Sequence, residues 1–213
     1  MIPVKVLAVR YLANASPSLC RALGVPEDYT ALAMLTTDSD DPTYIALDEA
    51  TKASQVQVCY SRSFYAGASN ASTPNAGEVI GILAGQTPGA VRSGMEAALA
   101  ALQQVGFQQA GQVPYLAYTV SRSGAYLSQL AGVEEGAALA YLIAPPLESM
   151  YALDAALKAA DGKLCKLFAP PSETNFGGGL LTGSRSACEA ACDAFAQAVA
   201  EVAQNAGGNY GIG

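Results

Sequence analysis

Two stretches of the chain place apolar residues on one face of a helix. Residues 88–105 carry them at positions 91, 95, 98, 102 and 105, and residues 186–204 carry them at positions 188, 192, 195, 199 and 202. This alternation of four-residue and three-residue steps is typical of an amphipathic helix packed against a core. We therefore predict long helices over Pro88–Val105 and Ser186–Gln204.

Shorter apolar runs, bounded by Gly, Pro or polar residues, predict strands and shorter helices. Strands are predicted over Val4–Leu12, Ala31–Thr36, Gln55–Arg62, Glu78–Ala84, Tyr115–Val120, Ala138–Ala144, Lys163–Phe168 and Gly179–Thr182. Helices are predicted around Leu19–Leu23, Thr43–Ser54, Leu127–Ala131 and Ser149–Ala160. Short strands mixed with a few helices indicate an α+β fold, an antiparallel-rich sheet with helices on one face.

The same order of elements occurs twice, and the residues repeat with it. Ala46–Ala53 and Ala152–Ala159 are identical at six of eight positions, and the same offset of 106 brings Cys59 onto Cys165. Upstream, residues 24–25 and 132–133 are both Gly-Val. The chain is therefore a tandem duplication. We predict domains over residues 1–108 and 109–213, with a short polar linker at Gln108–Val113.

Composition and charge exclude several classes of protein and binding partner. Hydrophobic residues make up 51% of the chain and charged residues 14%, which predicts a packed core rather than disorder. The net charge of −7 argues against a nucleic acid partner. The uncharged stretch Ala97–Ser121 is broken by Gln, Gly and Pro, so no membrane span is expected. The N-terminal run has no signal-peptide pattern, and we expect a cytosolic protein with reduced cysteines.

Catalytic chemistry has little support in the sequence. The chain contains no histidine, the commonest general base and zinc ligand. No Gly-x-Ser-x-Gly, phosphate-binding loop or His-Glu-x-x-His pattern occurs. Cys188 and Cys192 have the spacing of a metal pair, but they continue the apolar stripe and are interpreted as packing. We therefore expect no enzyme activity, no cofactor and no metal site.

Several motifs together resemble the bacterial microcompartment shell domain. They are ALAMLTTDSDDPTYIALDEATKAS, GEVIGILAG and QTPGAVRSGMEAALAAL in the first copy, and APPLESMYALDAALKAAD, PPSETNF and LTGSRSAC in the second. The strand usually found at the end of that domain stands in front here, at Val4–Leu12, so each copy resembles a circularly permuted unit. The chain is identified as a member of the tandem, circularly permuted shell proteins of the ethanolamine-utilisation type.

The resemblance implies an assembly. Members of this type form homotrimers whose six domains imitate a hexagon, tile into flat sheets with other shell proteins and surround a gated central pore. The implied location is the microcompartment shell in the cytoplasm. From the residues alone, two other classes stay open: a soluble small-molecule sensor with duplicated α+β domains, and an enzyme that uses acidic catalysis. A shell tile of another amine or diol compartment is a further alternative.

Lys52 and Lys158 occupy matched positions in the two copies. A solvated surface charge is the simple interpretation of each. The resemblance instead implies that both lie at the edge of the tile, where neighbouring tiles touch.

An acidic run, Asp38–Asp41, occurs in the first copy only. Asp41 before Pro42 is expected to cap the next helix, which would explain why one of the acidic residues occurs here. The other acidic residues could bind a hard metal ion or simply belong to a charged surface loop. The resemblance implies a pocket for a small amino-alcohol such as ethanolamine, whose protonated amine the carboxylates would balance. The pocket residues it implies are Asp40, Asp41, Glu78, Tyr65, Phe107 and Thr174.

Two loops are rich in small and polar residues, Ser63–Gly77 and Glu173–Gly179. Such segments have little apolar anchorage, which predicts mobility. They are interpreted either as plain surface loops or, from the resemblance, as the gate of the pore on the threefold axis.

Overall fold

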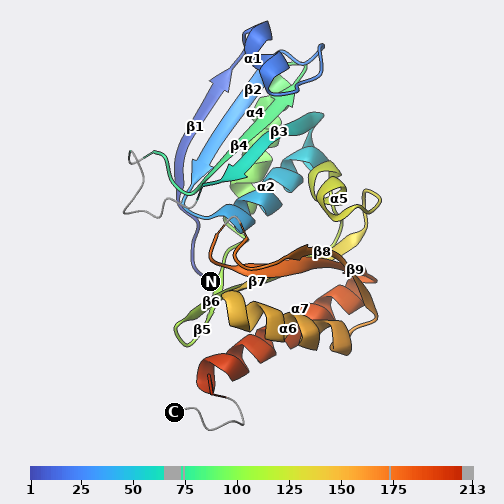
Figure 1. Ribbon diagram of the computed structural model, residues 1–213. Helices are drawn as coiled ribbons and strands as arrows, with labels where there is room; N and C mark the ends of the chain where they lie inside the picture. The colour runs from blue at the N-terminus through green and yellow to red at the C-terminus, as the bar shows by residue number, and fades with distance from the viewer. Residues whose placement is uncertain (65–72, 74, 173, 208–213) are drawn as a thin grey trace. The chain divides into compact units, whose positions relative to one another are not determined.

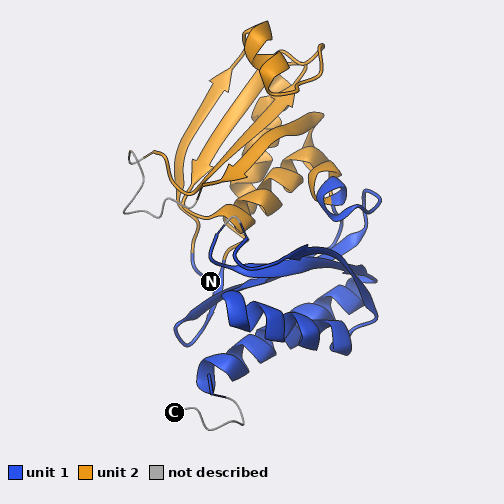
Figure 2. Cartoon of the chain, in the orientation of Figure 1, with its two compact units in different colours: residues 1–2, 107–123, 128–213 blue, residues 3–106, 124–127 orange. Residues whose placement is uncertain are grey.

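The computed structural model describes residues 1–64, 73, 75–172 and 174–207. The chain divides into two compact units (Figure 2). Unit 2 comprises residues 3–106 together with 124–127, and unit 1 comprises residues 1–2, 107–123 and 128–213. The division of the sequence into shell domains 1–108 and 109–213 stays a prediction.

Unit 2 is built on a four-stranded antiparallel sheet. Its strands are β1 (Val6–Leu12), β2 (Ala31–Thr37), β3 (Val56–Ser63) and β4 (Val79–Gly85), in the order β1-β2-β4-β3. Helices α2 (Asp40–Ala53) and α4 (Pro88–Ala101) pack against each other and the sheet (Figure 1). The short helix α1 (Pro17–Ala22) follows β1. Helix α4 ends before Leu102, earlier than the apolar stripe predicted.

Unit 1 repeats this plan with one added strand. The strands β5 (Gln108–Ala110), β6 (Val113–Val120), β7 (Ala138–Ala144), β8 (Gly162–Phe168) and β9 (Gly177–Gly183) form an antiparallel sheet in the order β5-β6-β7-β9-β8. Helices α6 (Pro146–Ala159) and α7 (Arg185–Gln204) pack together against it (Figure 1). Helix α5 (Ala125–Ala131) begins in the segment assigned to unit 2. The predicted α+β architecture is confirmed.

The duplication extends to irregular details of the backbone. Gly24 and Gly132 both have a φ of 67°. The residue after each glycine donates its N–H at 3.0 Å to the carbonyl oxygen five positions back, at residue 20 or 128. This is the usual way a helix ends at a left-handed glycine. The register of β3 and of β8 shifts at the matched residues Cys59 and Cys165.

The apolar stripe of α7 lies in the core of unit 1, where Cys188, Cys192, Phe195 and Val199 are buried. Burial raises the pKa of Cys192 to about 11, so its thiol stays protonated at neutral pH. The packing role predicted for this cysteine pair is confirmed.

Among the described residues, no group of three or more His, Cys, Asp or Glu has an arrangement that could hold a metal ion. No helix in the described part of the chain is both long and apolar enough to cross a membrane.

Two local predictions were wrong. Asp41 is not the cap of α2, because the helix begins at Asp40 with Ser39 in the capping position. Proline is tolerated in a first helical turn, where its missing N–H has no partner to lose, so the helix extends back through Pro42. The segment Gln108–Val113 is not a linker but a hairpin, in which Gly111 takes a φ of 61° between β5 and β6.

Candidate functional site

The acidic residues of the predicted pocket lie where β2 ends and β4 begins in unit 2. Thr37 pairs with Val79 at that end of the sheet, so Asp38 and Glu78 extend from neighbouring strands. Asp40 and Asp41 follow in the first turn of α2, with only 8% and 9% of their surfaces exposed. We call Asp38, Asp40, Asp41 and Glu78 the acidic cluster.

The carboxylates of the acidic cluster repel one another. The pKa of Glu78 is raised above its ordinary value of 4.5, first by burial and then by the charges of Asp40 and Asp38. The Asp38 carboxylate accepts the backbone N–H of Lys5 at 2.7 Å. The Asp40 carboxylate accepts the backbone N–H of Asp41 at 2.9 Å. A cation placed among these carboxylates would lower the free energy of the charged form of Glu78.

Three residues that sequence reasoning did not single out hold the acidic cluster together. Thr37 and Thr43 are fully buried, and their hydroxyls hydrogen-bond at 2.7 Å, which ties α2 to the end of β2. Gly77 has a φ of 66°, and a Cβ there would collide with the carbonyl oxygen of Thr37. Glu78 then donates its N–H to that same oxygen at 2.8 Å. The Ala-Gly-Glu sequence was the available signal, because glycine favours such a conformation.

The flanking residues of the predicted pocket lie elsewhere in the chain. Phe107 and Thr174 belong to unit 1, where both contact Phe176. The rings of Phe107 and Phe176 have centroids 5.7 Å apart, and the Thr174 hydroxyl accepts the Phe176 N–H at 3.1 Å. The structure thus brings the carboxylates together within unit 2, and Phe107 and Thr174 together within unit 1. Tyr65 lies outside the described residues.

The predicted gate falls largely on undescribed positions. Residues 65–72 and 74, which make up most of Ser63–Gly77, lie outside the described residues, as does Glu173 at the start of the second loop. Assignment of these loops as a gate stays a prediction.

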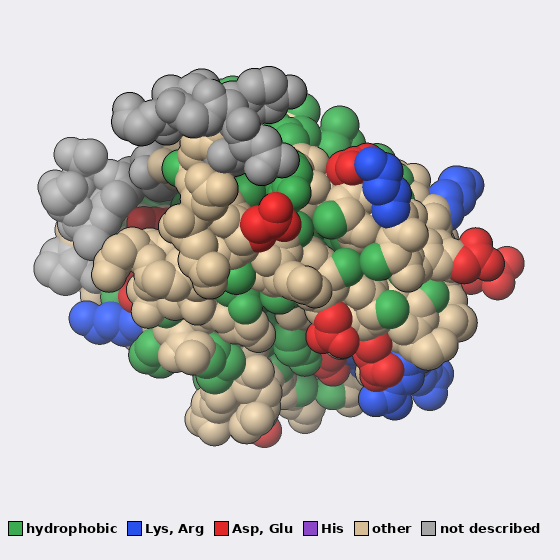
Figure 3. Space-filling view, turned by 90° about the horizontal axis from the view of Figure 1, so that it is seen from below, with side chains coloured by type: hydrophobic (Ala, Val, Ile, Leu, Met, Phe, Trp, Pro, Cys, Tyr) green, Lys and Arg blue, Asp and Glu red, His purple; other side chains and the backbone are tan. Residues whose placement is uncertain are grey.

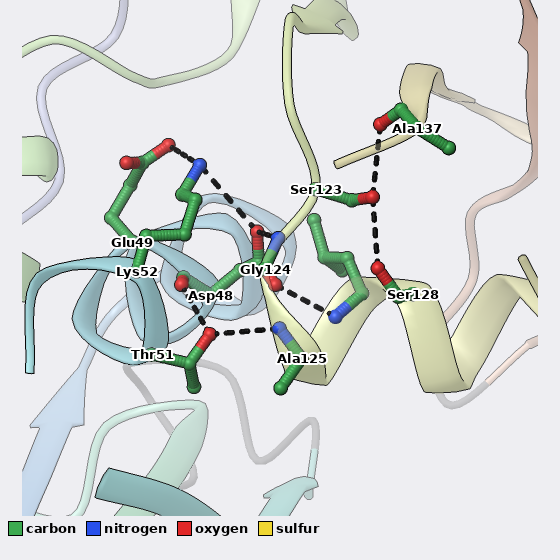
Figure 4. A network of polar contacts seen from close by, with 10 residues as sticks. Asp48, Glu49, Thr51, Lys52, Ser123, Gly124, Ala125, Ser128 and Ala137 are labelled. Carbon is green, nitrogen blue, oxygen red and sulfur yellow. Dashed lines mark hydrogen bonds and ion pairs between the residues drawn. The ribbon is translucent and has the colours of Figure 1, made fainter. Parts of the chain in front are cut away.

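A second polar site in unit 2 centres on Asp48 of α2 (Figure 4). Asp48 is fully buried, and its carboxylate accepts the N–H of Gly124 at 2.7 Å and the N–H of Leu127 at 2.8 Å. Burial raises the pKa of Asp48 above its ordinary value of 3.8, although the two N–H groups and Lys52 act in the opposite direction. The carboxylate therefore acts as a cap for residues 124–127 at the start of α5.

Residues 124 and 125 pack closely against α2 around Asp48. Thr51 accepts the N–H of Ala125 at 3.1 Å through its hydroxyl. A Cβ added at Gly124 would collide with the Thr51 hydroxyl and lie 2.8 Å from Cγ of Lys52. Only glycine fits at position 124 without a shift of the neighbouring atoms.

The two matched lysines have different surroundings. Lys52 lies 3.6 Å from the Asp48 carboxylate and hydrogen-bonds Glu49, and 25% of its side chain is exposed. Lys158 pairs with Asp154 at 2.6 Å, and 76% of its side chain is exposed. Their assignment to a tile edge stays a prediction.

The visible charge pattern agrees with the acidic composition. On the face in Figure 3, the Lys and Arg side chains of the described residues lie at several separate places, most of them beside Asp or Glu.

Comparison with known proteins defines the class first. The BMC domain family matches residues 31–115. Relatives that match nearly the whole chain are bacterial microcompartment shell proteins, so the chain belongs to that class. The chain is 58% identical over 209 residues to the bacterial microcompartment shell protein EutL of Clostridium perfringens, covering 96% of both chains. It is 47% identical to EutL of Escherichia coli, covering 96% of this chain and 95% of that one. The chain belongs to the EutL family of bacterial microcompartment shell proteins.

Solved structures give the same result. The monoclinic crystal structure of EutL from Clostridium perfringens matches with a TM-score of 0.95 and 58% identity, over 98% of this chain and 96% of that chain. EutL from Leptotrichia buccalis matches with a TM-score of 0.94 and 56% identity, over 96% of both. The trimeric shell protein PduB shares the fold at 20% identity, with a TM-score of 0.76 over 93% of this chain and 89% of that chain. The family predicted from the sequence motifs is confirmed.

Proposed function

We propose that this chain is a structural tile of an ethanolamine-utilisation microcompartment shell, assembling as a homotrimer beside other shell proteins. The main observation in support is the duplication: both units have the same strand order, the same helix end at a left-handed glycine and the same irregularity in a matched strand. Three copies of a two-unit chain supply six similar units around a threefold axis, the geometry of a pseudo-hexagon. The shell names of its close relatives support the same role.

The proposed tile has no catalytic turnover and lies in the microcompartment shell. The proposal includes a pore on the threefold axis, gated by the loops Ser63–Gly77 and Glu173–Gly179. This part of the proposal is based on the resemblance of the sequence to the shell family. Support for a purely structural role comes from the absence of histidine and from the close relatives, which are all named as shell proteins.

Neutralising both matched lysines is expected to abolish layers while leaving trimers intact. Glutamine is the replacement of choice, because a Glu at position 52 would bring a third acidic group beside Asp48 and Glu49. Native mass spectrometry should give a trimer for both the wild type and the Lys52→Gln/Lys158→Gln variant. Electron microscopy should show sheets or tubes for the wild type alone. Intact sheets in the variant would remove the lysines from the tile edge, and a monomeric wild type would contradict the tile itself.

We also propose that the acidic cluster binds a small protonated amino-alcohol such as ethanolamine, with Tyr65, Phe107 and Thr174 as flanking groups. The raised pKa of Glu78 supports this: burial is its largest cause, but the charges of Asp40 and Asp38 add to it, and an ammonium group would balance those charges. A conduit must release what it binds, so a dissociation constant of about 1 mM is expected.

Affinity for ethanolamine should decrease as the pH falls below neutral. Folding raises the pKa of Glu78, so its carboxylate gains a proton at a higher pH than an ordinary glutamate as the pH falls. Affinity should be constant near neutral pH and should weaken as the pH falls through this raised value. In that range, binding should release protons, since the ammonium displaces them. Calorimetry in two buffers of different ionisation enthalpy measures the release, and Glu78→Gln should remove it. Equal affinity at pH 7 and pH 4 would contradict the assignment.

A further inference from the structure

The end of the sheet that carries the acidic cluster has an exact structural counterpart in unit 1. Thr37 ends β2 and pairs with Val79, the first residue of β4. Ala144 ends β7 and pairs with Gly177, the first residue of β9. Helices α2 and α6 follow and have 14 residues each. The two units can therefore be compared residue by residue at this end.

The carboxylates of the acidic cluster have no counterparts in unit 1. The residues at the matched positions are apolar: Phe176 for Glu78 before the last strand, and Pro146 for Asp40 and Leu147 for Asp41 at the start of the helix. Asp38 lies in the connection from strand to helix, which is one residue longer in unit 2 than in unit 1. The acidic character belongs to one copy only.

The buried threonine pair beneath the acidic cluster changes together with it. Thr37 corresponds to Ala144, which has no hydroxyl, and Thr43 corresponds to Ser149, the fourth residue of α6. The Ser149 hydroxyl donates to the carbonyl oxygen of Pro146 at 2.9 Å. Ala144 and Ser149 are both fully buried. Unit 1 therefore makes the same passage from strand to helix without a hydroxyl at the end of the strand.

In unit 2 the two hydroxyls hold the backbone of Ser39. The Thr37 hydroxyl accepts the N–H of Ser39 at 3.2 Å and lies 2.9 Å from the Ser39 carbonyl oxygen. The Thr43 hydroxyl lies 2.7 Å from that carbonyl oxygen and 2.7 Å from the Thr37 hydroxyl. Each hydroxyl has one proton, so one of them donates to Ser39 while the other donates to its neighbour. Both polar groups of the Ser39 backbone are thus fixed.

Ser39 is the residue that joins two members of the acidic cluster, Asp38 and Asp40. Carboxylates held close together repel one another, so a loosely held connection would let them move apart. The charges of Asp40 and Asp38 both act on Glu78, which places the three groups near one another. Thr37 and Thr43 have no exposed surface, so water cannot readily replace their hydrogen bonds to the connection.

We propose that the hydroxyl pair of Thr37 and Thr43 positions the acidic cluster for a small ammonium ligand, and that the Thr37 hydroxyl serves this site rather than the fold. The inference rests on the proposed binding of ethanolamine and adds the residues that orient its carboxylates. Both side chains are fully buried, so they act through the backbone of Ser39 and not by contact with the ligand. Binding groups are effective when buried neighbours hold them in place before the ligand arrives.

Removal of one hydroxyl tests the proposal. Thr37→Val keeps the shape of the side chain and should weaken ethanolamine binding about tenfold at pH 7, because one buried hydrogen-bonding group is lost. Thr37→Ser retains the hydroxyl and should bind nearly as the wild type does. The control Thr182→Val removes a hydroxyl that donates to the Ala138 carbonyl at 2.9 Å in unit 1, and it should leave the affinity unchanged. Calorimetry measures affinity, and circular dichroism confirms that each variant is folded.

The titration of Glu78 without ligand gives a second readout. Carbon-13 NMR should show the Glu78 carboxyl titrating above 4.5 in the wild type and closer to 4.5 in Thr37→Val, where Asp38 and Asp40 are no longer held beside it. Thr182→Val should titrate as the wild type does.

The outcomes separate this inference from the proposed function. Wild-type affinity in Thr37→Val contradicts the inference alone, and so does a Thr37→Val variant that fails to fold, because the hydroxyl would then serve the fold. An equal loss of affinity in Thr182→Val contradicts it as well. A wild type that does not bind ethanolamine contradicts the proposed binding together with the inference.

Discussion

Replacing Asp48 with alanine is expected to lower the free energy of unfolding of unit 2 by about 3 kcal/mol. The substitution leaves the buried N–H groups of Gly124 and Leu127 without their acceptor and removes the buried carboxylate beside Lys52. A carboxylate with no exposed surface cannot be replaced by water without rearrangement of the segment. Urea unfolding followed by circular dichroism gives the change.

Two comparisons separate this effect from a general loss of charge. Asp48→Asn should recover part of the stability, because its amide oxygen can still accept one N–H. Asp193→Ala removes an exposed aspartate and should change the unfolding free energy by less than about 0.5 kcal/mol. A wild-type unfolding midpoint for Asp48→Ala would show that residues 124–127 do not depend on the carboxylate.

Neutralising three of the four carboxylates of the acidic cluster is expected to weaken ethanolamine binding at least tenfold, by about 1.4 kcal/mol or more. The variant Asp40→Asn/Asp41→Asn/Glu78→Gln keeps side-chain size but removes three charges that would face the ammonium. Isothermal calorimetry with ethanolamine, and with ethylene glycol as the uncharged analogue, measures the loss. Glycol binding should be weak in both proteins, since it carries no positive charge.

A matched variant controls for net charge. Glu27→Gln/Asp161→Asn/Asp193→Asn neutralises three exposed carboxylates and should bind ethanolamine like the wild type. The cluster variant should also remain folded at neutral pH. Because the pKa of Glu78 is raised, its contribution to stability is present at low pH and lost as the pH rises, so Glu78→Gln removes an unfavourable charge. Equal affinity in the cluster variant and the wild type would exclude this site.

The local hydrophobic pattern and the internal repeat of the sequence were sufficient to predict the architecture. The stripe at positions 188, 192, 195 and 199 predicted an amphipathic helix, and those side chains are buried in the core of unit 1. Periodicity is a property of neighbouring residues, so it can be predicted without tertiary contacts. The matching motifs at offsets of 106 and 108 likewise predicted two similar α+β units and the shell family.

Burial and tertiary contacts decided the rest. The hydroxyls of Thr37 and Thr43 are buried and hydrogen-bonded beside the start of α2, and the helix begins before the expected cap at Asp41. Asp48 and Asp154 are identical in the sequence repeat, yet one is buried beneath N–H groups and the other is exposed. Nothing in the local sequence distinguishes them, because the difference comes from residues 76 and 79 positions away in the chain. Burial and the pKa values that follow from it are therefore properties of the tertiary structure alone.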